Sequence, residues 1–152
     1  MTVRVQTEDF DIGAELEKLS AGNHQVGGVA SFIGLVRDIA PAGSGAASSM
    51  TLEHYPGMTE KRLAEIEAEA QRRWPLAASL IIHRYGRLDP GDRIVLVATA
   101  SSHREAALES CAFLIDWLKT EAPFWKLEAG PGGTKWVEAK DSDDARKAKW
   151  QK

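Results

Sequence analysis

The chain has 152 residues, of which 43% are hydrophobic and 27% are charged, proportions typical of one globular domain that buries a core. Its formal net charge of -3 gives no overall electrostatic reason to bind nucleic acid or an anionic membrane, so an anion site would have to be local. The single cysteine, Cys111, excludes an internal disulfide and a cysteine metal cluster.

The sequence shows no targeting or membrane-spanning segment. Residues 1–5 lack the apolar run of a signal peptide, and no segment approaches the length of a transmembrane helix. We therefore expect a cytoplasmic protein with no membrane partner. We also expect residues 1–140 to form one domain and residues 141–152 to form a charged, solvated tail.

The first half of the chain alternates strand patterns with two helix patterns. The predicted elements are strands at 3–6, 26–36 and 50–55, and helices at 11–19 and 59–74. Thr59 is expected to cap the second helix, and Pro75 to end it. The pair Gly27-Gly28 indicates a close approach of two backbones. Residues 40–49, rich in glycine, serine and alanine, are expected to form a flexible loop.

The second half adds two long strands, a long helix and a hairpin. The predicted elements are strands at 78–85 and 93–100, a helix at 102–120, and hairpin strands at 125–129 and 135–139 around Pro131-Gly132-Gly133. Strands and helices interleave without a strict βαβ repeat. The pattern therefore favours an α+β fold over a doubly wound sheet.

The start of the 102–120 helix is a candidate anion site. Ser101 and Ser102 are expected to cap its amides, and His103 and Arg104 add positive charge where the helix dipole is already positive. Such a site suits a phosphate. The alternative is a solvated helix start with an incidental arginine.

The end of the same helix carries a second candidate site. Lys119 ends a row of residues along the edge of the apolar face, and Lys126 follows the helix-stopping Pro123 and the aromatic pair Phe124-Trp125. An ammonium group against apolar walls is a stronger electrostatic and proton-transfer agent than one in water. The alternatives are a lysine that interacts with the helix dipole and a lysine that protects a strand edge.

The two candidate sites are far apart in one chain. A continuous helix from His103 to Lys119 rises about 24 Å, which is too far for both ends to hold one small substrate. Either there are two sites, or a symmetric dimer brings one protomer's helix start to its partner's helix end. We prefer the second hypothesis.

Other reactive residues carry weaker signals. Arg37, at the end of a strand, either grips an anion or is solvated. Cys111 lies on the inward stripe of its helix, which favours a core position over a nucleophile. His24, His54 and His83 are scattered along the sequence without ligand spacing, so no metal site is expected.

Several linked motifs, in order over nearly the whole chain, resemble the large, catalytic subunit of molybdopterin synthase. They are Gly34-Leu35-Val36-Arg37, Leu52-Glu53-His54-Tyr55-Pro56-Gly57-Met58-Thr59, Arg73-Trp74-Pro75, His83-Arg84, Pro90-Gly91-Asp92, Ser102-His103-Arg104, Lys119-Thr120-Glu121-Ala122-Pro123-Phe124-Trp125-Lys126 and Trp136-Val137-Glu138.

The resemblance implies an α/β hammerhead-type fold, in which a mixed sheet and two long helices are joined by an additional small antiparallel sheet. It also implies a homodimer flanked by two small ubiquitin-like sulfur-carrier subunits, forming a heterotetramer. Each carrier would insert a C-terminal Gly-Gly thiocarboxylate. The implied sulfurtransferase reaction moves two sulfurs to cyclic pyranopterin monophosphate and forms the molybdopterin dithiolene, with no cofactor.

The resemblance also implies roles for particular residues. The implied catalytic residues are Lys119 and Lys126, and the implied substrate-binding residues are Val36, Arg37, His103, Arg104, Lys119, Lys126, Leu127 and Glu128. Leu127 departs from the family, whose members commonly carry a basic residue there. Lys135 and Lys140 are alternative sources of that charge.

Two other functions compete with this hypothesis. One is a non-catalytic adaptor that docks a ubiquitin-like tail by adding a strand to its sheet. Unlike the enzyme, it does not need Lys119 and Lys126 near the end of that tail. The other is a small RNA-binding domain, which requires a basic face with exposed aromatics on strands. Here the aromatics gather around Pro123 and Trp136, which disfavours RNA binding.

Overall fold

The structure is a computed structural model that describes residues 2–38, 49–130, 133–137, 145, 148 and 150. Within this part, residues 125–130 and 133–137 are described by their backbone only. Most of the predicted 40–49 loop, the predicted turn residues Pro131 and Gly132, and Lys140 lie outside the described residues.

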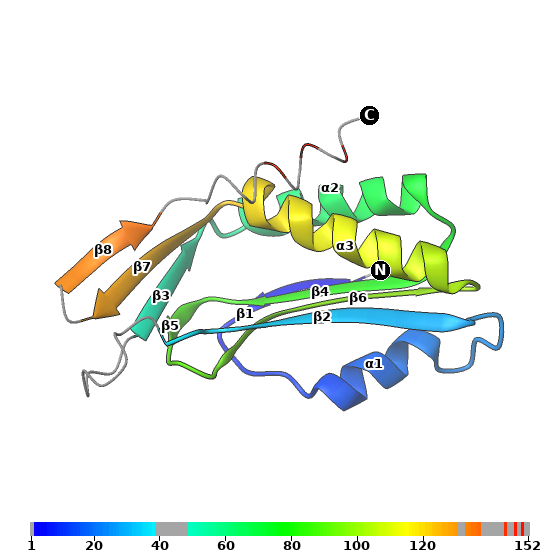
Figure 1. Cartoon of the computed structure of the whole chain (residues 1–152), viewed down its shortest axis with the longest axis horizontal. Coiled ribbons are helices and arrows are strands. Elements are labelled where there is room, and N and C mark those ends of the chain that lie inside the picture. Colours follow the sequence, from blue (N-terminus) through cyan, green and yellow to red (C-terminus); the bar gives the residue numbers. More distant parts are fainter. Residues whose placement is uncertain are drawn as a thin grey trace.

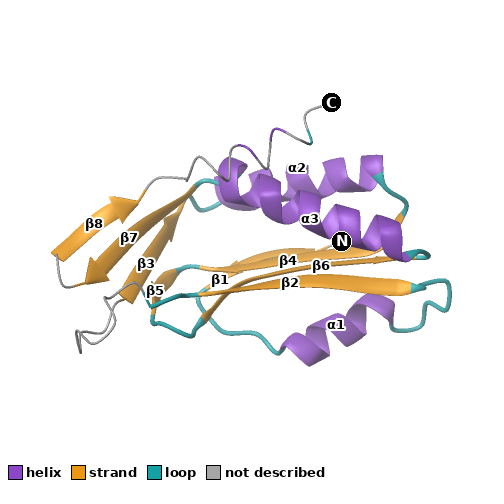
Figure 2. Cartoon of the chain, viewed as in Figure 1, coloured by secondary structure: helices purple, strands orange, loops and turns teal. Residues whose placement is uncertain are grey.

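The chain forms an α+β fold, which confirms the predicted fold class (Figure 1, Figure 2). The elements, in chain order, are β1 (Thr2–Gln6), α1 (Ile12–Ser20), β2 (Gly28–Leu35), β3 (Ser49–His54), α2 (Met58–Arg73), β4 (Leu76–Arg84), β5 (Gly86–Leu88), β6 (Arg93–Ser101), α3 (Arg104–Glu121), β7 (Phe124–Gly130) and β8 (Gly133–Val137).

A mixed sheet in the order β1-β4-β6-β2 forms the centre of the molecule. Strand β1 pairs with β4 in parallel, and the other two pairs are antiparallel. Helices α2 and α3 cover one face and α1 covers the other (Figure 1). Both faces are therefore buried, which explains the nearly continuous apolar runs of β4 and β6.

A second sheet, in the order β5-β3-β7-β8, lies at one end of the first (Figure 2). All its pairs are antiparallel, and the β7–β8 hairpin closes with Gly130 opposite Gly133. The sequence predicted this hairpin but missed β5. The chain passes from β4 into β5 at Gly86, whose φ of 87° is a left-handed conformation that favours glycine.

Helix α2 starts differently from the prediction. It begins at Met58 after an N-cap at Gly57, so Thr59 is not the cap. Glu60 takes part of that role, because its Oε2 accepts a hydrogen bond of 3.0 Å from the amide of Gly57. Thr59 is instead fully buried and bonds to other segments of the chain.

The buried apolar side chains of the described residues form three clusters. The largest fills the space between the first sheet and helices α2 and α3, a second lies under α1, and a third joins the two sheets. The third consists of Val36, Met50, Leu52 and Leu88, with Tyr85 and Ile94 packed against it. This cluster fixes the second sheet against the end of the first.

Trp150 differs from the expectation of a solvated tail. Its ring packs edge-on against Phe113 and Trp74, at centroid distances of 5.8 and 5.7 Å. Its Nε1 donates a 2.7 Å hydrogen bond to Asp116 Oδ2, and its carbonyl accepts one of 2.7 Å from Arg73 Nη1. The charged composition of residues 141–152 did not predict these contacts of Trp150 with α2 and α3.

Candidate functional site

Lys119 lies exposed in the last turn of α3. The helix ends two residues later, and the amide of Ala122 donates to the carbonyl of Leu118 at 3.3 Å. Pro123 cannot donate a backbone hydrogen bond, so the chain turns there and enters β7 at Phe124. The predicted helix end at 120 is thus confirmed to within one residue.

Beside this turn, the imidazole of His83 stacks on the ring of Phe124. The ring centroids are 3.8 Å apart with an interplanar angle of 19°. His83 is 5% exposed, and its Nδ1 lies 2.8 Å from the carbonyl oxygen of Arg84. Burial, with a smaller contribution from the neighbouring Lys119 and His54, lowers the pKa of His83 to about 3. The ring is therefore neutral near pH 7, with Nδ1–H donating to the carbonyl.

His54 approaches the same aromatic group from β3. Its ring centroid lies 6.4 Å from that of Phe124 and 4.1 Å from that of Tyr85. Its Nε2 lies 3.9 Å from Glu60 Oε1. Two of the histidines that are scattered in the sequence thus lie near the ring of Phe124. Sequence spacing missed this because β3 and β4 belong to different sheets.

Residues Lys126, Leu127 and Glu128 lie within β7, between β3 and β8. Their backbone partners in β3 are Leu52, Thr51 and Met50, respectively. The predicted segment is therefore a strand in the middle of the second sheet. It begins directly beyond the α3–β7 turn.

Val36 and Arg37 approach the second sheet from β2. Val36 is buried in the cluster that joins the two sheets, and its amide donates to the carbonyl of Asp92 at 2.9 Å. Arg37 follows it and is exposed. The guanidinium is therefore accessible to an anion near the end of the molecule that carries β7.

His103 and Arg104 lie exposed at the start of α3. His103 is the N-cap, and its side chain makes no capping hydrogen bond. The prediction that Ser101 and Ser102 cap this helix is wrong, because the N-cap residue is His103. Ser101 belongs to β6, is buried, and donates from Oγ to the carbonyl of Pro75 at 2.8 Å.

A close backbone contact holds this helix start. A Cβ on Gly27 would lie 2.0 Å from the carbonyl oxygen of Ser102, and the Gly27 amide donates to Ser101 at 2.9 Å. The close approach predicted from Gly27-Gly28 is confirmed at Gly27. It fixes the beginning of α3 against the segment that leads into β2.

The predicted site residues thus form two groups in one chain. One group lies toward the second sheet: Val36, followed by Arg37, packs in the cluster that joins the sheets, the backbone of 126–128 belongs to β7, and Lys119 lies in the turn of α3 that leads into β7. The other contains His103 and Arg104, at the opposite end of the 18-residue helix α3 (Figure 1). The predicted separation is confirmed, because these residues span a continuous helix of about 24 Å between His103 and Lys119.

Cys111 is a core residue, as predicted. It is 6% exposed, and burial raises the pKa of its thiol to about 11. The thiol is therefore protonated near pH 7 and is a poor nucleophile. A sulfur-transfer reaction at the candidate site would therefore need a sulfur donor other than Cys111.

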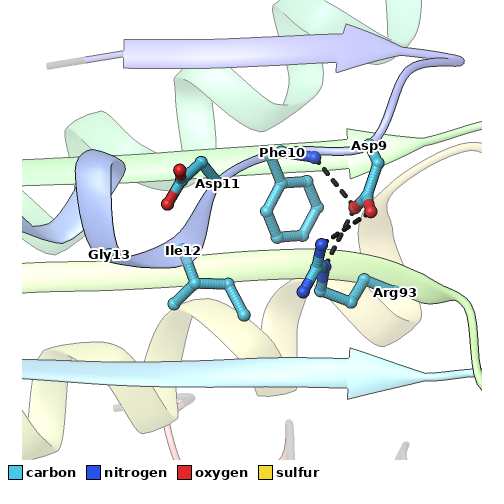
Figure 3. Close-up of a pocket in the computed structure, with 6 residues that line it drawn as sticks. All are labelled: Asp9, Phe10, Asp11, Ile12, Gly13 and Arg93. Atoms are coloured by element: carbon cyan, nitrogen blue, oxygen red, sulfur yellow. Dashed lines mark hydrogen bonds and ion pairs between the residues drawn. The ribbon is translucent and has the colours of Figure 1, made fainter.

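A shallow depression of about 510 Å³ lies elsewhere, at the start of α1 (Figure 3). It is lined by Asp9, Phe10, Asp11, Ile12, Gly13 and Arg93. Its one guanidinium, from Arg93, donates hydrogen bonds of 2.9 and 2.6 Å to both carboxylate oxygens of Asp9 (Figure 3). These bonds lower the pKa of Asp9 to about 2. The arginine is therefore already paired, and no predicted site residue lies here.

A family model described as MoaE protein matches residues 5–121. The chain belongs to the MoaE protein family. The match covers more than half of the chain and includes Val36, Arg37, both candidate residues at the start of α3, and Lys119. The resemblance drawn from the sequence motifs is confirmed.

Relatives within the MoaE family cover nearly the whole chain. A molybdopterin synthase catalytic subunit of Ralstonia nicotianae is 56% identical over 149 residues, covering 98% of this chain and 84% of the relative. The solved MoaE protein from Burkholderia ambifaria is 53% identical with a TM-score of 0.83 and covers 99% of each chain. Molybdopterin synthase from Staphylococcus aureus is 31% identical with a TM-score of 0.78, covering 89% of this chain and 96% of that one.

Among the described residues, no helix of this MoaE family member combines the length and the apolar character that a membrane crossing requires.

Proposed function

We propose that this chain is the catalytic subunit of a molybdopterin synthase. It transfers sulfur from the C-terminal thiocarboxylate of a small carrier subunit to cyclic pyranopterin monophosphate and forms the molybdopterin dithiolene. The observation that carries the proposal is the position of Lys119 where α3 passes into β7, the strand that contains Lys126. The family membership and the names of close relatives support the same activity.

The chemistry of the site suits this reaction. The thiocarboxylate and the phosphorylated pterin are both anions, and a local group of cations can bind them on a chain whose net charge is -3. Lys119 and Lys126 orient the thiocarboxylate, stabilise the negative charge that develops on attack, and move protons. Because the sulfur arrives on the carrier, the buried Cys111 is not needed as a nucleophile.

Substrate binding is assigned to the remaining candidates. Arg37, His103 and Arg104 hold the anionic substrate, and Val36 with the segment 126–128 lines the site. All three cationic or titratable side chains named here are exposed. Their interaction with a charged ligand therefore does not require the core to open.

A dimer completes the site in this proposal. A two-fold axis that places His103 and Arg104 of one protomer beside Lys119 of the other removes the separation of about 24 Å along the helix. Two carriers on such a homodimer form a heterotetramer. We place this reaction in the cytoplasm.

The direct test is incubation of the chain with a thiocarboxylated carrier and cyclic pyranopterin monophosphate, followed by dithiolene detection. The Lys119→Ala variant should lose about 10²–10³-fold in turnover, the effect of removing one preorganised charge-stabilising group. Lys18→Ala is the matched control, because this lysine is 73% exposed on α1. Full turnover by a folded Lys119→Ala variant would remove Lys119 from the mechanism.

Two further results separate the alternatives. Mixed dimers of Arg104→Ala and Lys119→Ala protomers should recover part of the activity, because one of their two shared sites is then intact. No recovery contradicts a shared site. A wild-type chain that binds the carrier but forms no dithiolene is instead a non-catalytic adaptor.

A further inference from the structure

The connection between α3 and β7 is short and held at several points. It consists of Ala122 and Pro123, and the amide of Phe124 donates back to the carbonyl of Ala122 at 2.9 Å. The carbonyl of Pro123 accepts a hydrogen bond of 3.1 Å from Thr59 Oγ1. These bonds fix the backbone of the turn but leave the ring of Phe124 to be held by other contacts.

Among the ring contacts of Phe124 in the part of the chain that the structure describes, the shortest is with His83. Its imidazole lies nearly parallel to Phe124 with ring centroids 3.8 Å apart, while its own orientation is held by the 2.8 Å bond from Nδ1 to the carbonyl of Arg84. His83 is the second-last residue of β4, which is an inner strand of the first sheet. The stack therefore ties the first residue of β7 to the central sheet.

We propose that His83 is a positioning residue for sulfur transfer. By stacking on Phe124, it fixes the start of β7 relative to the end of α3. It thereby sets the position of Lys119, on the helix, relative to Lys126, on the strand. This inference rests on the proposed function. It assigns no contact between His83 and the substrate.

The charge state of His83 fits a positioning role. The groups that act on its ring are Lys119 from α3, His54 from β3 and the carbonyl of Arg84 on its own strand. Burial and the first two groups lower the pKa of His83 to about 3, against the hydrogen bond to the carbonyl, which raises it. A neutral ring adds no second positive charge beside Lys119, and it does not exchange protons near pH 7.

Two substitutions separate the ring from its hydrogen bond. His83→Asn keeps a donor for the carbonyl of Arg84 and loses the stacked ring, whereas His83→Phe keeps a flat ring and loses the donor. If the stack positions the lysines, His83→Asn should lower kcat about tenfold or more, because small displacements of catalytic groups are costly, and should change KM for the pterin little. The kcat of His83→Phe should be much closer to that of the wild type than the kcat of His83→Asn is.

Leu80→Ala is the control for stability. This residue is 3% exposed on the same strand but packs toward α1, on the opposite face from α3. It should reduce the free energy of unfolding without changing kcat of the folded protein. If His83→Asn does not fold, Phe124→Leu and Phe124→Tyr test the stack from its other side, with the loss of kcat expected only for leucine.

The results distinguish this inference from the proposed function. If the wild-type chain forms no dithiolene, the proposed function fails and this inference fails with it. If the wild type is active and His83→Asn keeps its kcat, or His83→Phe loses as much as His83→Asn, only the positioning role is overturned. The ring-current shift of the His83 protons in NMR spectra, expected to disappear in Phe124→Leu, reports the stack independently of activity.

Discussion

The hydroxyl of Thr59 donates a 3.1 Å hydrogen bond to the carbonyl of Pro123, 64 residues further along the chain. The same oxygen accepts a hydrogen bond of 3.1 Å from the amide of Tyr55. One fully buried side chain thus joins the turn before α2 to the turn after α3. It thereby holds the end of β3 close to the start of β7.

Thr59→Val should destabilise the protein although the two side chains have nearly the same shape. It removes both hydrogen bonds and leaves the Pro123 carbonyl and the Tyr55 amide without this partner, which costs about 1–3 kcal/mol for a buried group left unsatisfied. Thr59→Ser keeps the hydroxyl and should cost less. Urea unfolding of the two variants measures the difference, and a valine variant as stable as the serine variant would contradict the role of the hydroxyl.

Burial of His83 predicts a pH dependence of stability. The unfolded chain takes up a proton on this residue below its ordinary pKa of 6.5, whereas the folded chain does so only near 3. The free energy of unfolding should therefore be highest above pH 6.5 and fall as the pH drops toward 3, by at most about 1.4 kcal/mol per pH unit from this one group. Urea unfolding between pH 4 and 7 measures it.

The control for this pH dependence is His83→Phe, which cannot titrate. Its curve should be flatter than that of the wild type over this window. The lost bond to Arg84 should shift the whole curve by an amount that does not vary with pH. Two parallel curves would show that His83 is not buried in its neutral form.

Adjacent glycines should respond differently to alanine. A Cβ on Gly27 meets the Ser102 carbonyl at 2.0 Å, whereas a Cβ on Gly28 has its nearest neighbour, Arg104 Cα, at an ordinary 3.7 Å. Gly27→Ala should therefore cost roughly 1–3 kcal/mol or more, because backbone must move. Gly28→Ala should change the free energy of unfolding by less than about 1 kcal/mol.

Urea unfolding compares these two glycine variants directly. Gly27→Ala should also weaken substrate binding, since the contact fixes the start of the helix that carries His103 and Arg104. Equal stability of the two variants would mean that the segment before β2 does not press against α3 as described.

Trp150 should contribute to stability despite its position near the end of the chain. Trp150→Ala removes ring contacts to Trp74 and Phe113 and the hydrogen bond to Asp116. Because the residue is only partly buried, the loss should fall below the 3–5 kcal/mol typical of a buried tryptophan, at about 2 kcal/mol.

Trp150→Phe separates the ring from its hydrogen bond. It keeps an aromatic ring and should cost about 1 kcal/mol for the bond to Asp116. Differential scanning calorimetry can rank the wild type, phenylalanine and alanine proteins. If alanine unfolds at the wild-type temperature, the tail is solvated, as its composition had suggested.

Local patterns in the sequence predicted most of the fold. Apolar spacing placed both long helices and most strands, and proline marked the ends of α2 and α3, because these signals depend on neighbouring residues alone. The motifs of the MoaE family and the candidate lysines were also readable without coordinates. The distance between His103 and Lys119 followed from helix geometry.

Long-range contacts decided the rest. The stack of His83 on Phe124, the bond from Thr59 to Pro123 and the anchor of Trp150 each join segments that are far apart in the chain. Capping also depended on tertiary contacts: Ser101 is a good cap by residue type, but its hydroxyl bonds to Pro75 in the assembled sheet. The sequence therefore showed which residues could act as acids, cations or caps. The partners of each side chain depended on which segments folding brought together.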